Sequence, residues 1–255
     1  ADARTIHALG GYACTSITAV TAQNTRGVTA WQPVPTALLT AQLAAVLDDL
    51  PVAAIKTGLL PGAAAVRAVA GALAGFRRIP LVVDPVIGST SGTRFLPPAG
   101  VRALLRDLLP LAALVTPNWL EAEALTGRRI QTFADAEAAA HRLLATGCRA
   151  VLVKGGHSPG RVCRDYLVVA GGHAVWFESP RIKTRNTHGT GCVLAAAIAL
   201  RLARGDSVEA ATAHARQFLL RGLAAGRAVV FGAGAGPAYG LTGGAGIRAP
   251  TRRPN

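Results

Sequence analysis

Short, almost wholly apolar segments alternate with longer helix-forming segments along most of this chain. The apolar segments read VAAIKTG at 52–58, PLVVDPV at 80–86, LAALVTPN at 111–118 and RAVLVKGG at 149–156. Stretches rich in Ala and Leu, which favour helix, stand between them. Strands that are apolar on both faces are typical of a parallel sheet that helices cover on both sides. The pattern therefore predicts an α/β fold, a three-layer α/β/α sandwich with a mostly parallel central sheet.

The expected helices cover residues 35–50, 61–76, 98–109, 121–127 and 132–147, and two more close the fold, the first from Val193 to Arg204. The β-rich stretch 13–22 is expected to be another strand of the covered sheet, and 165–179 a hairpin. No linker divides the chain before a glycine-rich stretch near its end. We therefore expect a single domain over residues 1–237, followed by a disordered Gly- and Arg-rich tail, residues 238–255.

The formal net charge of +14 makes nucleic acid a candidate partner. However, the 27 basic residues are spread thinly and aromatic residues make up only 5% of the chain, so no dense basic run interleaved with aromatics occurs. No apolar run reaches about 18 residues, the length of a membrane span. The four cysteines, Cys14, Cys148, Cys163 and Cys192, lack C-x-x-C spacing, which favours reduced thiols. We expect a cytoplasmic protein without nucleic-acid or membrane partners.

Polar residues stand where the predicted strands end. They are Gln23 with Asn24, Lys56, Asp84, Asn118 with Glu121, and Lys154 with Gly155 and Gly156. Ligands of open α/β sheets bind beyond the carboxyl ends of the strands, so these residues should lie around one site. Each also has a simpler explanation taken alone, because Asp-Pro and Gly-Gly form turns and Asn caps helices. Their convergence on one sheet edge favours the functional interpretation.

Glycines precede a long apolar helix in the segment NTHGTGCVLAAAIAL, residues 186–200. Gly189 and Gly191 allow a tight turn before this helix. The amides of the turn and of the first helical residues, including Thr190 and Cys192, lack helical partners and carry partial positive charge, which makes an anion site. The same field should lower the pKa of the Cys192 thiol. The simpler alternative is a turn capped by threonine, with Cys192 as a small core residue.

Together these residues suit phosphoryl transfer, which needs cations and dipoles around the phosphoryl oxygens, a metal, and a base near the acceptor hydroxyl. The amides of Gly189–Cys192 supply the dipoles, and Lys154 supplies a mobile positive charge. Asp84 and Glu121 offer hard oxygen ligands for Mg²⁺. Cys192 is placed to take a proton from an alcohol. No Walker A pattern occurs, so a P-loop enzyme is excluded.

Five motifs give the chain a family resemblance: TAVTAQNTRGV, VVDPV, TPNWLEAEALTG, VLVKGGH and NTHGTGC. In this order they resemble the hydroxymethylpyrimidine and phosphomethylpyrimidine kinases of thiamin biosynthesis, within the ribokinase-like superfamily. The resemblance runs from Ala1 to about Pro237. Cys192, where sugar kinases have aspartate, and the run Gln23–Thr25 both point to the vitamin-kinase branch.

For catalysis and the nucleotide, the resemblance implies a role for several residues. Cys192 would be the catalytic base, in the anion hole formed by Gly189, Thr190, Gly191 and Cys192 itself. The nucleotide phosphates would meet Lys154, Gly155, Thr187 and Asn118.

For the metal and the acceptor, the resemblance implies roles for a second set of residues. Asn118 and Glu121 would form an N-x-x-E element tied to Mg²⁺, with Asp84 nearby. Gln23 would pair its amide with the aminopyrimidine edge. Leu59 and Val86 would give the ring apolar walls.

The activity that the resemblance implies is ATP- and Mg²⁺-dependent phosphorylation of 4-amino-5-hydroxymethyl-2-methylpyrimidine, and then of its monophosphate, by a homodimer. A pyridoxal or pyridoxine kinase of the same superfamily remains an alternative, because both substrates are flat heterocycles with a hydroxymethyl group. A non-catalytic ligand-binding relic is the alternative from another class.

Family members begin with a strand and a glycine-rich loop that carries an aspartate, and this sequence starts after that loop, at ADARTIHALGGYA. By resemblance, about twenty residues with a strand and this loop are expected before Ala1.

Overall fold

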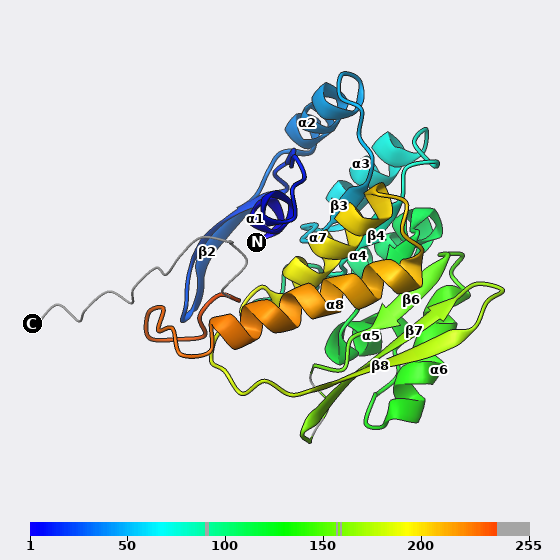
Figure 1. The fold of residues 1–255 in the computed structure, drawn as a ribbon. Helices are drawn as coiled ribbons and strands as arrows, with labels where there is room; N and C mark the ends of the chain where they lie inside the picture. Colours follow the sequence, from blue (N-terminus) through cyan, green and yellow to red (C-terminus); the bar gives the residue numbers. More distant parts are fainter. Residues whose placement is uncertain (90–91, 157, 159, 239–255) are drawn as a thin grey trace, which may run out of the picture.

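The computed structural model describes residues 1–89, 92–156, 158 and 160–238, so all but the first residue of the predicted tail lies outside the described residues. Six strands form the main sheet, in the order β3-β4-β5-β6-β7-β8 (Figure 1). They are β3 (Ile55–Thr57), β4 (Leu81–Val83), β5 (Leu114–Val115), β6 (Ala150–Val153), β7 (Val162–Val169) and β8 (Ala174–Pro180). The strands run parallel from β3 to β6, and β7 and β8 are antiparallel. The predicted mostly parallel sheet and the hairpin are confirmed.

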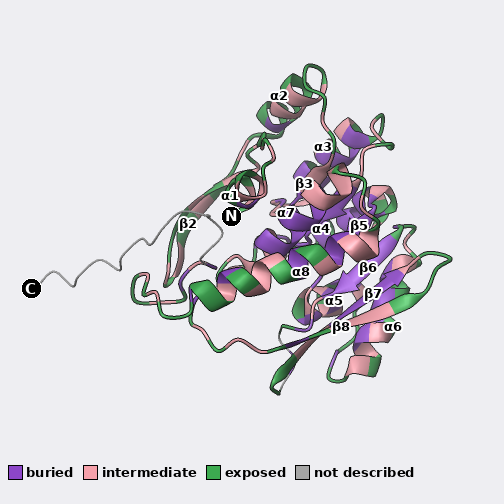
Figure 2. Cartoon of the chain, in the orientation of Figure 1, coloured by how far each residue is buried: buried purple, intermediate pink, exposed green. Residues whose placement is uncertain are grey.

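Helices cover both faces of this sheet. They are α1 (Asp2–Ala8), α2 (Thr36–Leu47), α3 (Ala63–Leu73), α4 (Pro98–Ala103), α5 (Trp119–Thr126), α6 (Phe133–Leu144), α7 (Thr190–Ala203) and α8 (Val208–Ala225). Successive strand residues point to opposite faces, so Val83 packs in the cluster under α3 to α6 while Val82 packs under α7 and α8. The strands β4, β5 and β6 are buried along their whole length, and α7 is buried from Val193 to Ala199 (Figure 2). The predicted three-layer α/β/α arrangement is therefore confirmed.

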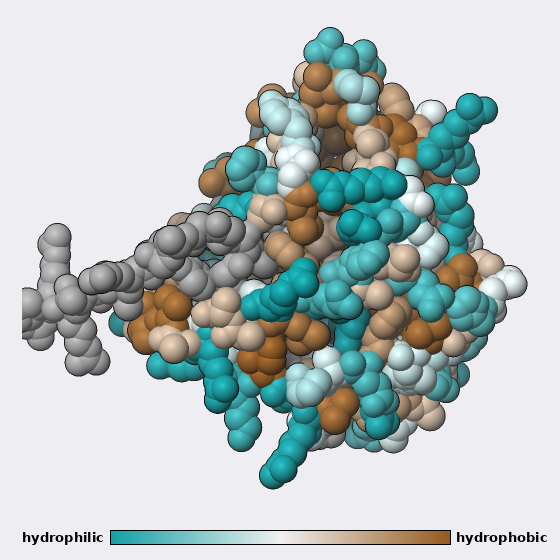
Figure 3. All heavy atoms as spheres, viewed as in Figure 1, coloured by the Kyte–Doolittle hydropathy of each residue, from teal (hydrophilic) through white to brown (hydrophobic). Residues whose placement is uncertain are grey.

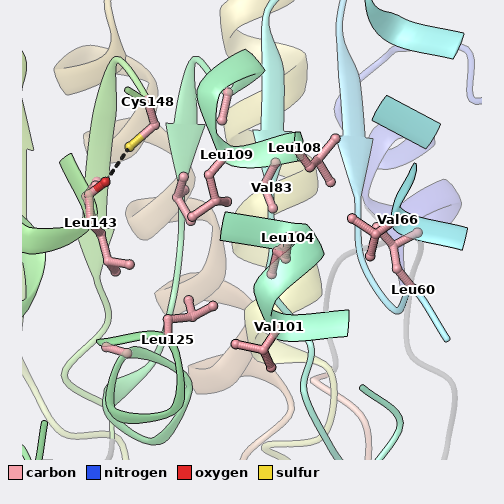
Figure 4. Close-up of a cluster of buried hydrophobic side chains, with 14 of the residues drawn as sticks. Leu60, Val66, Val83, Val101, Leu104, Leu108, Leu109, Leu125, Leu143 and Cys148 are labelled. Carbon is pink, nitrogen blue, oxygen red and sulfur yellow. Dashed lines mark hydrogen bonds between the residues drawn. The ribbon is translucent and has the colours of Figure 1, made fainter. Parts of the chain in front are cut away.

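The larger core cluster lies between the sheet and the helices α3 to α6 (Figure 4). The helix expected over 98–109 is not continuous there, because α4 passes into a π-helical turn, η1 (Leu104–Leu108), and a 3-10 turn, η2 (Leu109–Leu111). Pro110 has no N–H to continue an α-helical ladder, which accounts for the tightened end. Among the helices that the structure describes, none is long and apolar enough to cross a membrane.

A separate antiparallel ribbon consists of β1 (Ala19–Asn24) and β2 (Gly27–Pro33) and extends away from the main sheet (Figure 1). The expectation that 13–22 is a strand of the covered sheet is wrong. Only its end is strand, and Val20 there is 63% exposed. β-propensity predicts an extended segment but not the strand with which it pairs, and that partner, β2, is not predicted from the sequence. At its tip the ribbon contacts a glycine-rich loop, where the Gly234 N–H donates to Thr25 Oγ1 at 3.1 Å.

A cavity of about 580 Å³ lies beside β3, which is an edge strand of the main sheet as far as the chain is described. Its walls come from α1, α2, β3 and the segment 12–18. The surface is hollowed near α2, with hydrophobic side chains around the opening (Figure 3). The expectation of a further strand before Ala1 stays a prediction.

Candidate active site

The N-terminus of α7 is built by a glycine in the left-handed region. Gly189 caps the helix at φ 78° and ψ 8°, a conformation that side chains rarely adopt. Its carbonyl accepts the N–H of Val193 at 2.9 Å, so the helix begins at Thr190, three residues earlier than expected. The amides of Gly191 and Cys192 therefore stand in the first turn, where no helical carbonyl precedes them. The predicted glycine turn and its helix N-terminus are present.

Three strand ends bring a cation and two carboxylates to this helix end. Lys154, after β6, places Nζ 2.8 Å from Asp84 Oδ1, after β4, and 3.8 Å from Glu121 Oε2. A Cβ on Gly191 would lie only 3.0 Å from Lys154 Nζ, so α7 packs directly against this group. Thr116 adds a hydrogen bond to Asp84 at 3.2 Å. The carboxyl ends of neighbouring parallel strands meet at one edge, which explains the convergence.

The two carboxylates differ in their ionisation. Burial opposes the ionisation of Asp84, but the ammonium groups of Lys154 and Lys56 outweigh it and hold its pKa below the ordinary value. For Glu121, burial dominates and raises its pKa to about 7, with Lys154 opposing the rise and Asp84 adding to it. Glu121 also closes a capping box, since its Oε2 accepts the Asn118 N–H at 2.7 Å and its own N–H donates to Asn118 Oδ1 at 2.9 Å.

The expected acidification of Cys192 is wrong. The half-buried side chain has its pKa raised to about 11, and burial is the main cause. Lys56 and Lys154 lower the pKa, while Asp84 and Asp2 raise it. A thiolate needs solvation that this packed helix end does not provide, and the cations and carboxylates nearby partly cancel. The thiol is therefore neutral at pH 7 in the ligand-free protein.

Beside the Cys192 thiol lies an ion pair that the sequence does not predict. Lys56 Nζ lies 2.8 Å from Asp2 Oδ2, and the Lys56 side chain is only 7% exposed. Burial opposes the charge of Lys56, but Cys192, Asp84 and Asp2 outweigh it and raise its pKa. The sequence marks Lys56 only as a residue at a strand end. Asp2 gave no signal at all, because an acid in the first turn of a helix is common for local reasons.

The remaining predicted site residues stand on β1, after β3 and β4, and in the loop before α7. Gln23, exposed on β1, places Nε2 3.3 Å from Nε2 of His188, which precedes the glycine turn. Leu59 and Val86 are half-buried near the ends of β3 and β4. Thr187 is exposed in the same loop as His188.

Gly155 follows Lys154 but turns its amide inward, donating to Asp165 Oδ1 at 2.7 Å. This amide therefore does not face the glycine turn, and contact of Gly155 with a nucleotide stays a prediction.

The donor set suits Mg²⁺. No group of three or more His, Cys, Asp or Glu side chains gathers as a metal site in the part of the chain that the structure describes. However, Asp84 and Glu121 converge on the same ammonium group, and Mg²⁺ is commonly held by one or two carboxylates together with substrate phosphates. These two residues fit that arrangement.

The fold, with its glycine-turned helix end facing a lysine and two carboxylates, defines a kinase of the ribokinase-like class. The sequence profile of the family described as phosphomethylpyrimidine kinase matches residues 1–239, and the chain belongs to this family.

Individual proteins agree with this assignment. A hydroxymethylpyrimidine/phosphomethylpyrimidine kinase of Rhizobium meliloti is 44% identical over 240 residues, covering 94% of this chain and 90% of that protein. The crystal structure of phosphomethylpyrimidine kinase from Clostridium difficile 630 matches with a TM-score of 0.74 and 33% identity, over 85% of this chain and 89% of that one. An ADP complex of Bacillus subtilis pyridoxal kinase matches with a TM-score of 0.80 and 31% identity, over 87% and 84% of the two chains.

Proposed function

We propose that this protein transfers the γ-phosphoryl group of ATP to the hydroxymethyl group of 4-amino-5-hydroxymethyl-2-methylpyrimidine and then to the resulting monophosphate, in thiamin biosynthesis. The observation that carries the proposal is the convergence of Lys154, Asp84 and the first-turn amides of α7 on one point. Family membership and the names of the relatives support the same activity.

The nucleotide side of the site comes from Lys154, Thr187 and Asn118. Lys154 and the amides of Gly191 and Cys192 stabilise negative charge on the phosphoryl oxygens, as the loose transition state of phosphoryl transfer requires. The Thr190 N–H already donates to the Thr187 carbonyl at 3.3 Å, so it is left out of this role. Asp84 and Glu121 would hold Mg²⁺, which, when bound, offsets the charge of the phosphates. Since Lys154 is already paired with Asp84, it is held in place before a nucleotide arrives.

Cys192 is proposed as the base for the acceptor hydroxyl. Its high pKa makes the thiolate a strong base but a scarce one at pH 7. Lys56 and Lys154 are the groups that favour the thiolate. The acceptor ring is proposed to lie between Leu59 and Val86, with its amino edge paired to the Gln23 amide.

A kinase assay with three acceptors tests the proposal: the hydroxymethylpyrimidine, its monophosphate and pyridoxal. We expect ATP- and Mg²⁺-dependent turnover with both pyrimidines, and products identified by phosphorus NMR. Lys154→Met serves as the inactive control. Preference for pyridoxal would make the protein a pyridoxal kinase. No turnover with any acceptor, in protein that binds ATP, would make it a binding relic.

We also propose that the protein acts in the cytoplasm as a homodimer. Family resemblance is the support for both statements. Light scattering coupled to gel filtration tests the dimer, and a fluorescent fusion tests the location.

A further inference from the structure

Behind Lys154 lies a buried ion pair that the proposed mechanism does not use. Asp165, on β7, is paired through Oδ2 with Nη1 of Arg216, on α8, and both residues are at most 8% exposed. Arg216 also donates from Nη2 to Ser179 Oγ on β8 at 3.2 Å. Removing two charges from water costs free energy that their attraction repays only in part, so such a pair is weak support for stability by itself.

The other oxygen of Asp165 reaches the loop that carries Lys154. Oδ1 accepts the N–H of Gly155, the next residue, at 2.7 Å. A Cβ on Gly155 would lie 1.8 Å from the Arg164 carbonyl oxygen, so the loop is pressed directly onto β7. On the other side, the Lys154 N–H donates to the Pro117 carbonyl at 2.8 Å. The backbone of Lys154 is thus held between β5 and Asp165.

We propose that Asp165 is a positioning residue, which Arg216 holds in place and which aims Lys154 at the nucleotide phosphates. The proposal rests on the proposed function, because Lys154 is assigned to the nucleotide there. A carboxylate can accept from the Gly155 amide and from Arg216 at the same time. An asparagine in its place keeps one acceptor but turns an NH₂ group toward the other donor, so one of the two links is lost.

The variants Asp165→Asn and Arg216→Met, made in the full chain, test the proposal. For each variant we would measure the Michaelis constants of ATP and of the pyrimidine, the Kd of ADP by calorimetry, and the melting temperature. We expect the Michaelis constant of ATP and the Kd of ADP to rise about tenfold in both variants, with the Michaelis constant of the pyrimidine unchanged. Arg201→Met is the matched control, because it breaks another ion pair, 2.6 Å to Asp206, in the last turn of α7, at the opposite end of this helix from the glycine turn. It should lower the melting temperature without raising either nucleotide constant.

Epistasis with Lys154 separates positioning from simple destabilisation. In a Lys154→Met background, Asp165→Asn should raise the Kd of ADP no further, because the residue through which it acts is gone. An equal rise in both backgrounds would overturn the proposal, as would unchanged nucleotide constants in folded Asp165→Asn. If Asp165→Asn and Arg216→Met do not fold, Ser179→Ala replaces them, because it removes only one contact of Arg216. It should give a smaller rise in the same constants, and an unchanged Kd of ADP in Ser179→Ala overturns the proposal. If the wild-type chain binds ADP but phosphorylates no pyrimidine, the proposed function fails, and the Kd of ADP still decides the role of Asp165.

Discussion

Cys192 stands at a helix end that should favour a thiolate, yet burial raises its pKa to about 11 from the ordinary 9.0. Below this pKa the thiolate fraction grows tenfold with each pH unit. If Cys192 is the base, turnover should therefore rise with pH from 6 to 9. A pH–rate profile at saturating substrates measures this.

Alanine variants at two cysteines test whether the role of base belongs to the Cys192 thiol. Cys192→Ala should lower turnover by about 10²–10⁴-fold and remove the rise above pH 8, where Glu121, with a pKa of about 7, is already ionised, with the affinity for ATP largely kept. Cys14→Ala, at an exposed thiol, should behave as wild type. A flat profile in the wild-type protein, or near wild-type turnover in Cys192→Ala, would exclude the base role.

Gln23 belongs to the acceptor side of the proposed site. Gln23→Leu keeps the approximate volume but leaves the pyrimidine edge unpaired, which should cost about 1–3 kcal/mol per unpaired buried group. We expect the Michaelis constant of the pyrimidine to rise while that of ATP stays the same. Gln32→Leu is the control, because Gln32 is an exposed glutamine on the partner strand of the same ribbon. An equal rise for both substrates would mean that Gln23 is structural.

At the scale of elements, the β1–β2 ribbon depends on its contact with the glycine-rich loop that follows α8. A Cβ on Gly234 would lie 1.9 Å from the Thr25 carbonyl oxygen, so Gly234→Ala must move the ribbon tip that neighbours Gln23. We expect a higher Michaelis constant for the pyrimidine and a nearly unchanged melting temperature, because a two-stranded ribbon adds little to the core.

Gly71→Ala is the control for this prediction. A Cβ there meets nothing within 4 Å, and alanine in a helix interior should stabilise α3 by about 0.5–1 kcal/mol. A large fall in melting temperature for Gly234→Ala, without a kinetic effect, would contradict a role of the ribbon in acceptor binding.

At the scale of the whole molecule, we expect a substitution in the core to change stability without changing substrate affinity at the site. Leu108 is fully buried in the larger core cluster, so Leu108→Ala should lower the free energy of unfolding by about 2–5 kcal/mol. The Michaelis constants, measured well below the melting temperature, should not change. Urea unfolding and steady-state kinetics check both points, with Leu120→Ala, at a leucine that is 62% exposed, as the control. Altered affinity for ATP in Leu108→Ala would show that core and site are coupled.

Much of the layered fold can be predicted from the sequence, because the residue patterns that predict each strand and helix are local. Each apolar run of the sheet has helical neighbours within a few residues, and the strands from β3 to β8 all fall within or overlap the expected segments. The turn at Gly189 and the N-cap at Asn118 likewise depend on residues within one helical turn.

The sequence by itself therefore determined the three layers, the glycine turn and the residues that end the strands at one edge of the sheet. Only the tertiary structure decided that β1 leaves this sheet to pair with β2, that Asp2 reaches Lys56, and that Asp165 joins Gly155 to Arg216. These contacts join residues far apart in the chain, and strand register and helix packing set them rather than local propensity. The pKa of Cys192 has the same origin, because desolvation depends on everything packed around the thiol, whereas the helix end that suggested a thiolate is visible in the sequence.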